Sequence, residues 1–161
     1  AQRSFTKSTW PGLLDHIVAG GQPYGISPVQ NVIKECAEEA NIPQHLASRA
    51  KSVGAVSYIS TDELNNIKRD ALFVYDLRLP MTFLPTPVDG EVQKFTLMNI
   101  EQVIALCTHN YAGEEKSEYP YHYKPNCNLV VIDFLIRHGI INSQSSRYLE
   151  LVGKLRTASC L

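Results

Sequence analysis

Residues 20–42, GGQPYGISPVQNVIKECAEEANI, place three glutamates within two turns of a predicted helix that follows a glycine-rich loop. Ser27 predicts the start of the helix, because its hydroxyl can cap the first turn and Gln30 follows three residues later, as in a capping box. Asn41 and Pro43 predict its end, since Asn tolerates a left-handed C-terminus and Pro cannot extend a helix. The stretch is therefore expected to fold as a loop followed by a helix.

The two faces of this helix differ in polarity. Apolar residues at helical spacing predict the face that packs on the core: Val29, Val32, Ile33, Cys36, Ala37 and Ala40. At about 100° per residue, Glu35, Glu38 and Glu39 lie away from that stripe. Like charges at this spacing repel by roughly 0.2–0.5 kcal/mol per pair, so local stability does not explain them. A hard cation such as Mg²⁺ would explain them, with a solvated acidic face as the alternative.

Together with the preceding loop, the helix resembles the Nudix box, G-x5-E-x7-R-E-U-x-E-E-x-G-U, in which U is a bulky aliphatic residue. The spacing is intact, and all three helical glutamates are in place. Charged or special positions of the motif differ as follows: Ile26 replaces the first Glu, Lys34 replaces Arg and Asn41 replaces the final Gly. Because that Glu and Arg commonly pair in Nudix proteins, we expect the internal ion pair to be remodelled.

The flanking sequence resembles a Nudix subgroup related to the N-terminal half of fungal thiamine pyrophosphokinases. Short segments along nearly the whole chain carry this likeness: Arg3-Ser4, Lys7, Trp10-Pro11-Gly12, Leu14-Asp15, Ala19-Gly20-Gly21, Arg69-Asp70, 73–76, Leu79-Pro80, 89–92, 124–127 and 129–139. The resemblance implies an α/β (α+β) fold, a Nudix-like α/β/α sandwich with a mixed, partly curled β-sheet. It also implies an enzyme that uses Mg²⁺ or Mn²⁺ to cut thiamine diphosphate, or its oxidised or damaged analogues, into the monophosphate and phosphate.

The same resemblance assigns chemical roles within the box. Glu35, Glu38 and Glu39 are the expected metal ligands, and Glu35 or Glu39 could also orient the attacking water. Glu91 is the leading candidate for a separate catalytic base. Its competitors, each with a solvated carboxylate as the alternative interpretation, are Asp89, Glu114 and Glu115.

The lead-in to the box also resembles isopentenyl-diphosphate isomerase, a Nudix-fold enzyme of another reaction class. There an Arg and a Lys spaced like Arg3 and Lys7 hold a diphosphate, because two cations can match two phosphates. The catalytic Cys and metal-binding His of the isomerase would fall at Ala19 and Gly21, which can perform neither role. A hydrolase is therefore favoured, with Arg3 and Lys7 as substrate-binding residues.

The glycines and aromatic residues leave alternatives open. Gly20 and Gly21 could let backbone amides approach phosphate oxygens, or could serve only a tight turn. Trp10 could line the ligand pocket or close the core. A long loop could stack on the substrate ring, or could be only a surface loop, with these tyrosines: Tyr111, Tyr119, Tyr121 and Tyr123.

Three function classes follow from these observations. The first is a diphosphate hydrolase acting on thiamine diphosphate-like compounds. The second is a Nudix hydrolase of a nucleoside diphosphate derivative, such as ADP-ribose or a dinucleotide. The third is a non-catalytic Nudix-fold module that binds a ligand or partner. Retention of the three helical acids argues against the third class, whereas loss of Glu at Ile26 keeps it open.

The length favours one domain spanning residues 1–161. The Nudix resemblance implies that a longer protein supplies an N-terminal strand or domain, because Nudix domains normally have a strand before the position of Arg3. A net charge of −1 gives no basic field for nucleic acid, and the apolar stretches are too short for a membrane span. The partner is therefore expected to be a small-molecule diphosphate, with the oligomeric state left open. The four cysteines contain no C-x-x-C pair, which predicts reduced thiols in an intracellular protein, cytoplasmic or organellar. The five histidines show no metal spacing.

Periodicity and breaker residues predict the remaining elements. Strands are expected at 53–59, 71–79 and 92–98, with a polar link at 60–69 and a proline-rich loop at 80–89. Helices are expected at 44–51, 100–107, 126–138 and 145–155.

Overall fold

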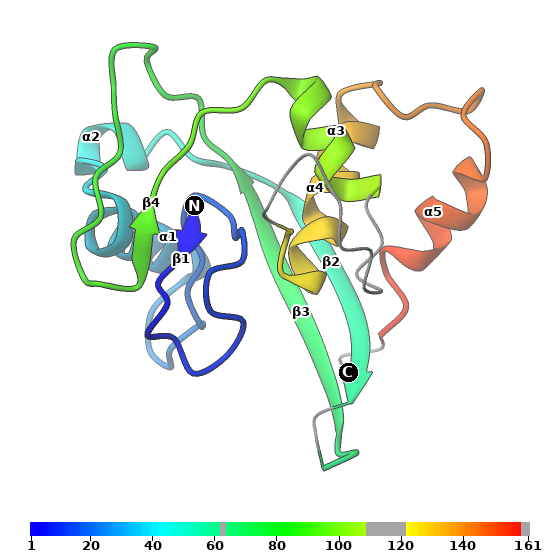
Figure 1. The fold of residues 1–161 in the computed structure, drawn as a ribbon, viewed down its shortest axis with the longest axis horizontal. Coiled ribbons are helices and arrows are strands. Elements are labelled where there is room, and N and C mark those ends of the chain that lie inside the picture. The colour runs from blue at the N-terminus through cyan, green and yellow to red at the C-terminus, as the bar shows by residue number, and fades with distance from the viewer. Residues whose placement is uncertain (62–63, 109–121, 159–161) are drawn as a thin grey trace. The chain divides into compact units, whose positions relative to one another are not determined.

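The computed structural model describes residues 1–61, 64–108 and 122–158, and it combines helices with antiparallel strand pairs (Figure 1). This confirms the α+β class. The elements are β1 Gln2–Arg3, α1 Pro28–Ala40, α2 Gln44–Ala47, β2 Lys51–Thr61, β3 Ile67–Asp76, β4 Val92–Lys94, α3 Ile100–Thr108, α4 Pro125–Arg137 and α5 Tyr148–Lys154. The chain forms two compact units, one of Ala1–Lys51 with Asp76–Cys127 and one of Ser52–Tyr75 with Asn128–Leu161.

Helix α1 begins and ends where the sequence predicts. The Ser27 hydroxyl accepts the Gln30 N–H at 3.4 Å, and the Gln30 side chain accepts the Ser27 N–H at 2.8 Å, which completes the capping box. Asn41 has φ 53°, in the left-handed region, and the next residue, Ile42, donates its N–H to the Cys36 carbonyl. Asn therefore ends this helix as Gly would.

The core of the first unit forms between α1, α2 and the segment that joins them. Its buried members are Cys36, Ala40, Ile42, Leu46 and Ala47, and Val32 and Ile33 pack against them. The predicted apolar stripe is wrong at Val29 and Ala37, which are exposed. Two polar residues of α1, Asn31 and Glu39, are buried instead, because the loop before the helix covers them.

Short extended segments pair side by side in the first unit. Strand β4 pairs antiparallel with β1, and β1 forms an antiparallel bridge with Leu14. Leu14 in turn forms a parallel bridge with Tyr123: its N–H donates to the His122 carbonyl, and its carbonyl accepts the Lys124 N–H, both at 2.8 Å. Parallel and antiparallel pairing thus occur together, and distant segments of the chain meet beside Leu14.

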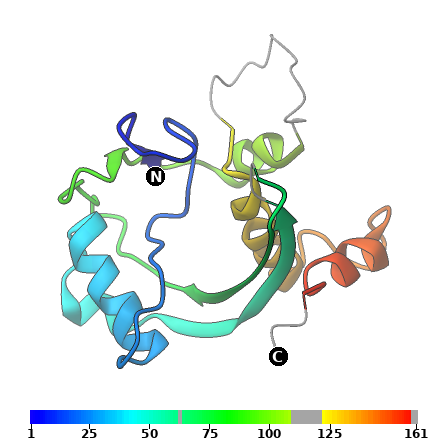
Figure 2. The same ribbon diagram turned by 90° about the horizontal axis from the view of Figure 1, so that it is seen from below.

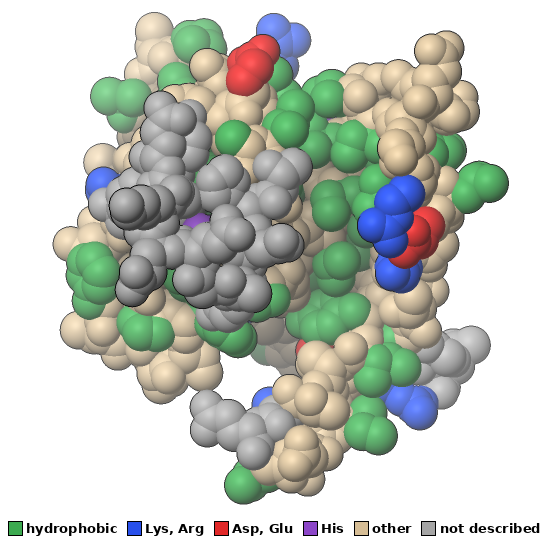
Figure 3. Space-filling model, turned by 45° about the vertical axis from the view of Figure 1, so that its right-hand side comes forward, with side chains coloured by type: hydrophobic (Ala, Val, Ile, Leu, Met, Phe, Trp, Pro, Cys, Tyr) green, Lys and Arg blue, Asp and Glu red, His purple; other side chains and the backbone are tan. Residues whose placement is uncertain are grey.

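The second unit contains an antiparallel ribbon of β2 and β3 that curves along its length (Figure 2). Its core is Val56, Val74 and Leu155, packed with apolar residues of α4. The buried carboxylate of Asp133 accepts hydrogen bonds from two arginines of the same unit. On the face drawn in Figure 3, hydrophobic side chains are interspersed with polar surface, and acidic and basic side chains lie next to one another.

The strand boundaries differ from those expected. Strand β2 extends to Thr61, and β3 covers 67–76 rather than 71–79, because backbone pairing in a hairpin satisfies N–H and C=O groups whatever the side chains. The polar link expected at 60–69 is therefore partly strand. Strand β4 stops at Lys94 because its partner, β1, has two residues. The loop expected at 80–89 is confirmed.

The helices expected outside α1 are all present, with shifted bounds. Helix α3 begins with a capping box, in which the Asn99 side chain accepts the Gln102 N–H and the Gln102 side chain accepts the Asn99 N–H, both at 2.9 Å. Helix α4 ends before Gly139, which has φ 73°. Helices α2 and α5 are shorter than predicted. Within the described ranges, each helix is too short or too polar to cross a bilayer.

Candidate functional site

A polar cleft of about 510 Å³ opens in the first unit beside α1 and the loop that precedes it. The leading site residues expected from the sequence line this cleft: Arg3, Lys7, Gly20, Gly21, Glu35, Glu38, Glu39 and Glu91. Sequence reasoning gave no role, or only a secondary one, to other residues that line it: Asp15, His16, Lys34, Asp89 and Lys124. The fold therefore gathers the acids of α1 and basic residues from distant segments around one space.

Glu39 is the buried acid of the cleft, with a relative exposure of 7%. The Ala19 N–H donates to its Oε2 at 3.0 Å. Burial raises the pKa of Glu39 to about 7; the carboxylates of Glu35, Asp89 and Glu91 also raise it, whereas the Ala19 N–H opposes them. A solvated acidic face is thus the wrong description of this residue, because its carboxylate is withdrawn from water.

Lys34 forms the remodelled ion pair that the sequence led us to expect. Its ammonium group lies 2.8 Å from Glu35 Oε1 and 2.7 Å from Glu38 Oε2. The hydrogen bonds to Glu35 and then Glu38 raise the pKa of Lys34 above its ordinary value. The Glu35 side chain is 14% exposed and that of Glu38 52%. Lys34 thus neutralises part of the negative charge of Glu35 and Glu38, which a bound metal ion would otherwise neutralise.

The glycine loop fits closely over α1 at one position. A Cβ on Gly20 would lie 2.1 Å from Glu35 Cδ, so only glycine leaves room for that carboxylate, whereas a Cβ on Gly21 would meet nothing within 4 Å. The Gly21 carbonyl accepts a hydrogen bond from Asn31 Nδ2 at 3.0 Å. Gly20 thus permits the Glu35 position, and the approach of the loop amides to phosphate stays a prediction.

All three guanidinium nitrogens of Arg3 donate hydrogen bonds within the protein. Its Nη1 donates to Asp15 Oδ2 at 2.7 Å, Nη2 to the Thr9 carbonyl at 2.8 Å and Nε to the Trp10 carbonyl at 3.1 Å. Trp10 is 39% exposed and is not among the residues that line the cleft. Arg3 therefore braces the loop that follows β1.

The predicted base, Glu91, is half exposed and forms an ion pair with Lys7. Asp89 holds the turn before it, because its Oδ1 accepts the Glu91 N–H at 2.9 Å. Tyr123 lies in the Leu14 bridge rather than on the cleft. The other candidates lie outside the described residues: Tyr111, Tyr119, Tyr121, Glu114 and Glu115.

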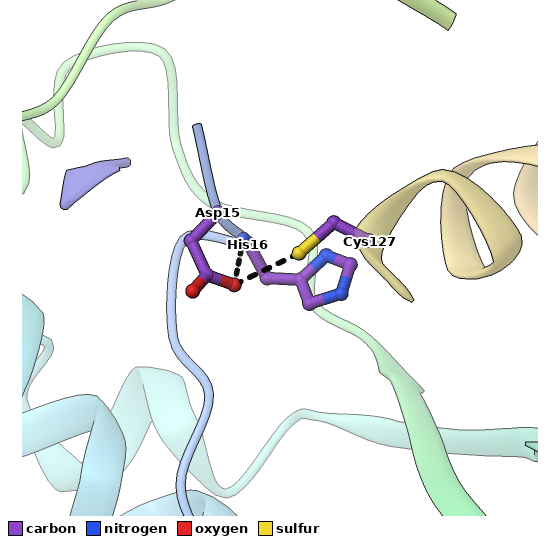
Figure 4. A group of neighbouring side chains, drawn as sticks. All are labelled: Asp15, His16 and Cys127. Carbon is purple, nitrogen blue, oxygen red and sulfur yellow. Dashed lines mark hydrogen bonds between the residues drawn. The ribbon is translucent and has the colours of Figure 1, made fainter. Parts of the chain in front are cut away.

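Asp15, His16 and Cys127 form a compact group beside the cleft (Figure 4). Each offers one possible metal-ligating atom, and these atoms lie within 4.8 Å of one another. Asp15 Oδ1 accepts the His16 N–H at 2.8 Å and the Cys127 thiol at 3.0 Å. The spacing of the histidines in the sequence did not predict this group. No local spacing pattern links Cys127 to Asp15 and His16, which lie far from it along the chain.

Charge and burial act differently on the three members of this group. Burial lowers the pKa of His16 and raises that of Cys127, so the imidazole is neutral and the thiol keeps its proton. For Asp15 burial acts to raise the pKa, but the Cys127 hydrogen bond and the Lys124 charge outweigh it and lower the pKa. The group is therefore a hydrogen-bonded link between residues 15–16 and the start of α4.

The carboxylates on α1 fit a hard divalent ion. They offer oxygen ligands one turn apart, which Mg²⁺ and Mn²⁺ prefer, and Cys36 is turned away into the core. Glu39 would gain from such an ion, since its ionised form is disfavoured by burial and by the neighbouring acids. The residues that would hold the ion are Glu35, Glu38 and Glu39.

Comparison with known proteins gives relatives from plants and yeast, although no protein-family model matches the chain. The chain is 49% identical to Nudix hydrolase 20, chloroplastic, and 48% identical to Nudix hydrolase 24, chloroplastic, both from Arabidopsis thaliana. Each similarity covers 99% of this chain and 40% of the relative. An uncharacterized protein of Saccharomyces cerevisiae is 40% identical over 96% of this chain and 45% of its own length. The chain thus spans less than half of these relatives, and the similarities support its assignment to the Nudix superfamily.

Proposed function

We propose that this chain, as a relative of the Nudix hydrolases, is a Mg²⁺- or Mn²⁺-dependent hydrolase of a phosphoanhydride bond. Its proposed substrate is thiamine diphosphate, or an oxidised or damaged analogue, and its products are the monophosphate and phosphate. The observation that carries the proposal is the single cleft lined by Glu35, Glu38 and Glu39 together with basic side chains. The α/β/α sandwich implied by the family resemblance is part of the same proposal.

The α1 carboxylates would hold the metal ion, which when bound neutralises phosphate oxygens and lowers the pKa of a bound water. The Ala19 N–H donates to Oε2 of Glu39, which would leave Oε1 for the ion or the water. Gly20 leaves room for the Glu35 carboxylate, which a Cβ at this position would overlap. The protein thereby presents preorganised negative charge on one side of the cleft.

The other side of the cleft binds the substrate's phosphates and receives a proton. The ammonium group of Lys7 can exchange its ion pair with Glu91 for one with a phosphate oxygen. The pair is partly exposed, and its two residues come from different segments of the chain. Release of Lys7 leaves the Glu91 carboxylate free to accept a proton from the attacking water. Two plant relatives are named chloroplastic, so the proposed intracellular location includes an organelle.

The test is phosphate release from thiamine diphosphate, oxythiamine diphosphate, ADP-ribose and ADP, with Mg²⁺ and with EDTA, for the wild type and Glu39→Gln. Products are identified by mass. We expect metal-dependent release from the thiamine compounds, reduced roughly 10²- to 10³-fold in the variant, as when one electrostatic contact to a transition state is removed. The matched control is Glu101→Gln, an exposed acid at the start of α3.

Other outcomes assign other functions. Turnover of ADP-ribose alone would replace the thiamine substrate by a nucleoside diphosphate derivative. If no compound is cut by the wild type, a non-catalytic binding role becomes the better account. Equal loss in Glu39→Gln and Glu101→Gln would remove the special role of the α1 carboxylates.

A further inference from the structure

We infer that Lys124 is a diphosphate-binding residue of this cleft, and that Arg3 acts as a brace rather than as a phosphate ligand. The inference rests on the proposed function and names a substrate contact that neither the motif nor the similarity to other proteins assigns. It follows from how the basic side chains around the cleft are already bonded.

Most of the cations that line the cleft are engaged by the protein. Arg3 uses its Nε and both Nη groups on Asp15 and on two backbone carbonyls. Lys7 pairs with Glu91, and Lys34 lies between two glutamates. Lys124 differs, because the closest acidic atom recorded for it in the described ranges is Asp15 Oδ2, at 3.8 Å.

That contact leaves most of the ammonium charge of Lys124 available. Asp15 Oδ2 already accepts Arg3 Nη1 at 2.7 Å, and Oδ1 accepts donors from His16 and Cys127. One carboxylate thus faces two cations, and the sum of the three charges is positive. The Cys127 thiol adds no negative charge, because burial raises its pKa. An anion entering the cleft therefore meets one uncompensated cation here.

The backbone around Lys124 is fixed on both sides. Its N–H donates to the Leu14 carbonyl at 2.8 Å, and its own carbonyl accepts the Cys127 N–H at 2.9 Å. Pro125, the first residue of α4, follows directly and restricts the main chain. The side chain is 26% exposed. Lys124 is therefore held at its base, with its free end on the cleft.

A phosphate oxygen satisfies what Lys124 lacks. An ammonium group offers three donors, and hydrogen bonds between charged partners are stronger than neutral ones. With Lys7 released from Glu91, two lysines from distant segments would contact a diphosphate, while the α1 carboxylates hold the metal ion. Asp15 acts as a positioning residue, since it holds Arg3 and faces Lys124.

The test compares Lys124→Met, Lys124→Arg and a control, Lys94→Met, which removes an exposed lysine of β4 that does not line the cleft. Steady-state KM and kcat are measured with thiamine diphosphate, and binding of methylenediphosphonate with Mg²⁺ is measured by calorimetry. For Lys124→Met we expect KM and the diphosphonate Kd to rise about 10- to 100-fold, the worth of one charged hydrogen bond. We expect kcat to change less, Lys124→Arg to recover most of the affinity, and Lys94→Met to match the wild type.

The results distinguish failure of the Lys124 assignment from failure of the proposed function. If the wild type releases phosphate but Lys124→Met binds and reacts normally, the Lys124 assignment is overturned and the proposed function stands. If the wild type binds the diphosphonate through Lys124 but cuts no substrate, the binding assignment stands without the hydrolase. If the wild type neither binds nor cuts, both are overturned. Thermal unfolding of each variant separates loss of binding from loss of fold.

Discussion

Two buried carboxylates, Glu39 beside the cleft and Asp133 in the second unit, have similar exposure but opposite environments. Asp133 is 3% exposed and accepts Arg137 Nε at 2.7 Å and Arg156 Nη2 at 3.0 Å. Glu39 is 7% exposed, accepts one backbone N–H and has other carboxylates nearby. A buried acid matched by arginines is explained by structure alone. A buried acid surrounded by acids is stabilised by a proton, as its raised pKa indicates, or by a bound cation.

Neutralising these two acids should affect stability in opposite ways. Asp133→Asn removes the negative charge that Arg137 and Arg156 face, and we expect it to lower the free energy of unfolding by about 2–3 kcal/mol. The loss is smaller than for a fully buried pair because both arginines reach solvent, with side-chain exposures of 22% and 51%. Glu39→Gln should leave stability unchanged or raise it in EDTA. Urea unfolding measures the free energy of unfolding of both variants. Equal losses in the two variants would contradict the difference between the environments of Asp133 and Glu39.

Stability of the metal-free protein should depend on pH through Glu39. Its pKa rises from 4.5 to about 7 on folding, so the folded state binds this proton more tightly. The contribution is fully present below the unfolded pKa and is lost as the pH rises through the folded one, on the order of 3 kcal/mol. Mg²⁺ should restore stability above that range.

This dependence is measured by thermal unfolding of the wild type and Glu39→Gln on either side of the window, with EDTA and with Mg²⁺. The gap between wild type and variant should change with pH in EDTA. A constant gap would mean that Glu39 does not titrate in this range.

Gly20→Ala should disturb the carboxylate side of the cleft without unfolding the protein. The new methyl group would overlap Glu35 Cδ, the end of a flexible side chain that can move away. We expect kcat/KM to fall on the order of tenfold, because displacement of a positioned group by about 1 Å is costly. Gly21→Ala is the matched control, since a Cβ there meets nothing within 4 Å. Similar activity in the two variants would contradict a positioned Glu35.

Lys34→Met should have the smallest effect. Its ammonium group competes with a metal ion for Glu35 and Glu38, but the lysine side chain is 41% exposed and such pairs contribute little. We expect the Mg²⁺ concentration for half-maximal activity to fall roughly two- to fivefold, the effect of one exposed ion pair. A titration of activity against Mg²⁺ measures this, with Lys94→Met alongside. A rise in that concentration would show that Lys34 supports the metal site instead.

Local sequence signals predicted α1 and its acids well. The capping box, the left-handed end at Asn41 and the spacing of the glutamates all depend on residues a few positions apart, so pattern alone was sufficient. The lengths of β2, β3 and β4 were predicted less well, since each strand extends only as far as its partner pairs with it. The exposure of Val29 and Ala37 was missed, because periodicity does not show what covers the opposite side of a helix.

The sequence by itself thus determined the loop–helix unit and its three carboxylates, because backbone preferences and side-chain periodicity act over short separations. Only the tertiary structure decided which acid is buried and which cation stays available. Pairing of the chain beside Leu14 brings Lys124 to Asp15, and the loop at Ala19 and Gly20 closes over Glu39 and Glu35. Desolvation and Coulomb interactions depend on distance in space rather than on separation along the chain, so these properties appear only once distant segments meet.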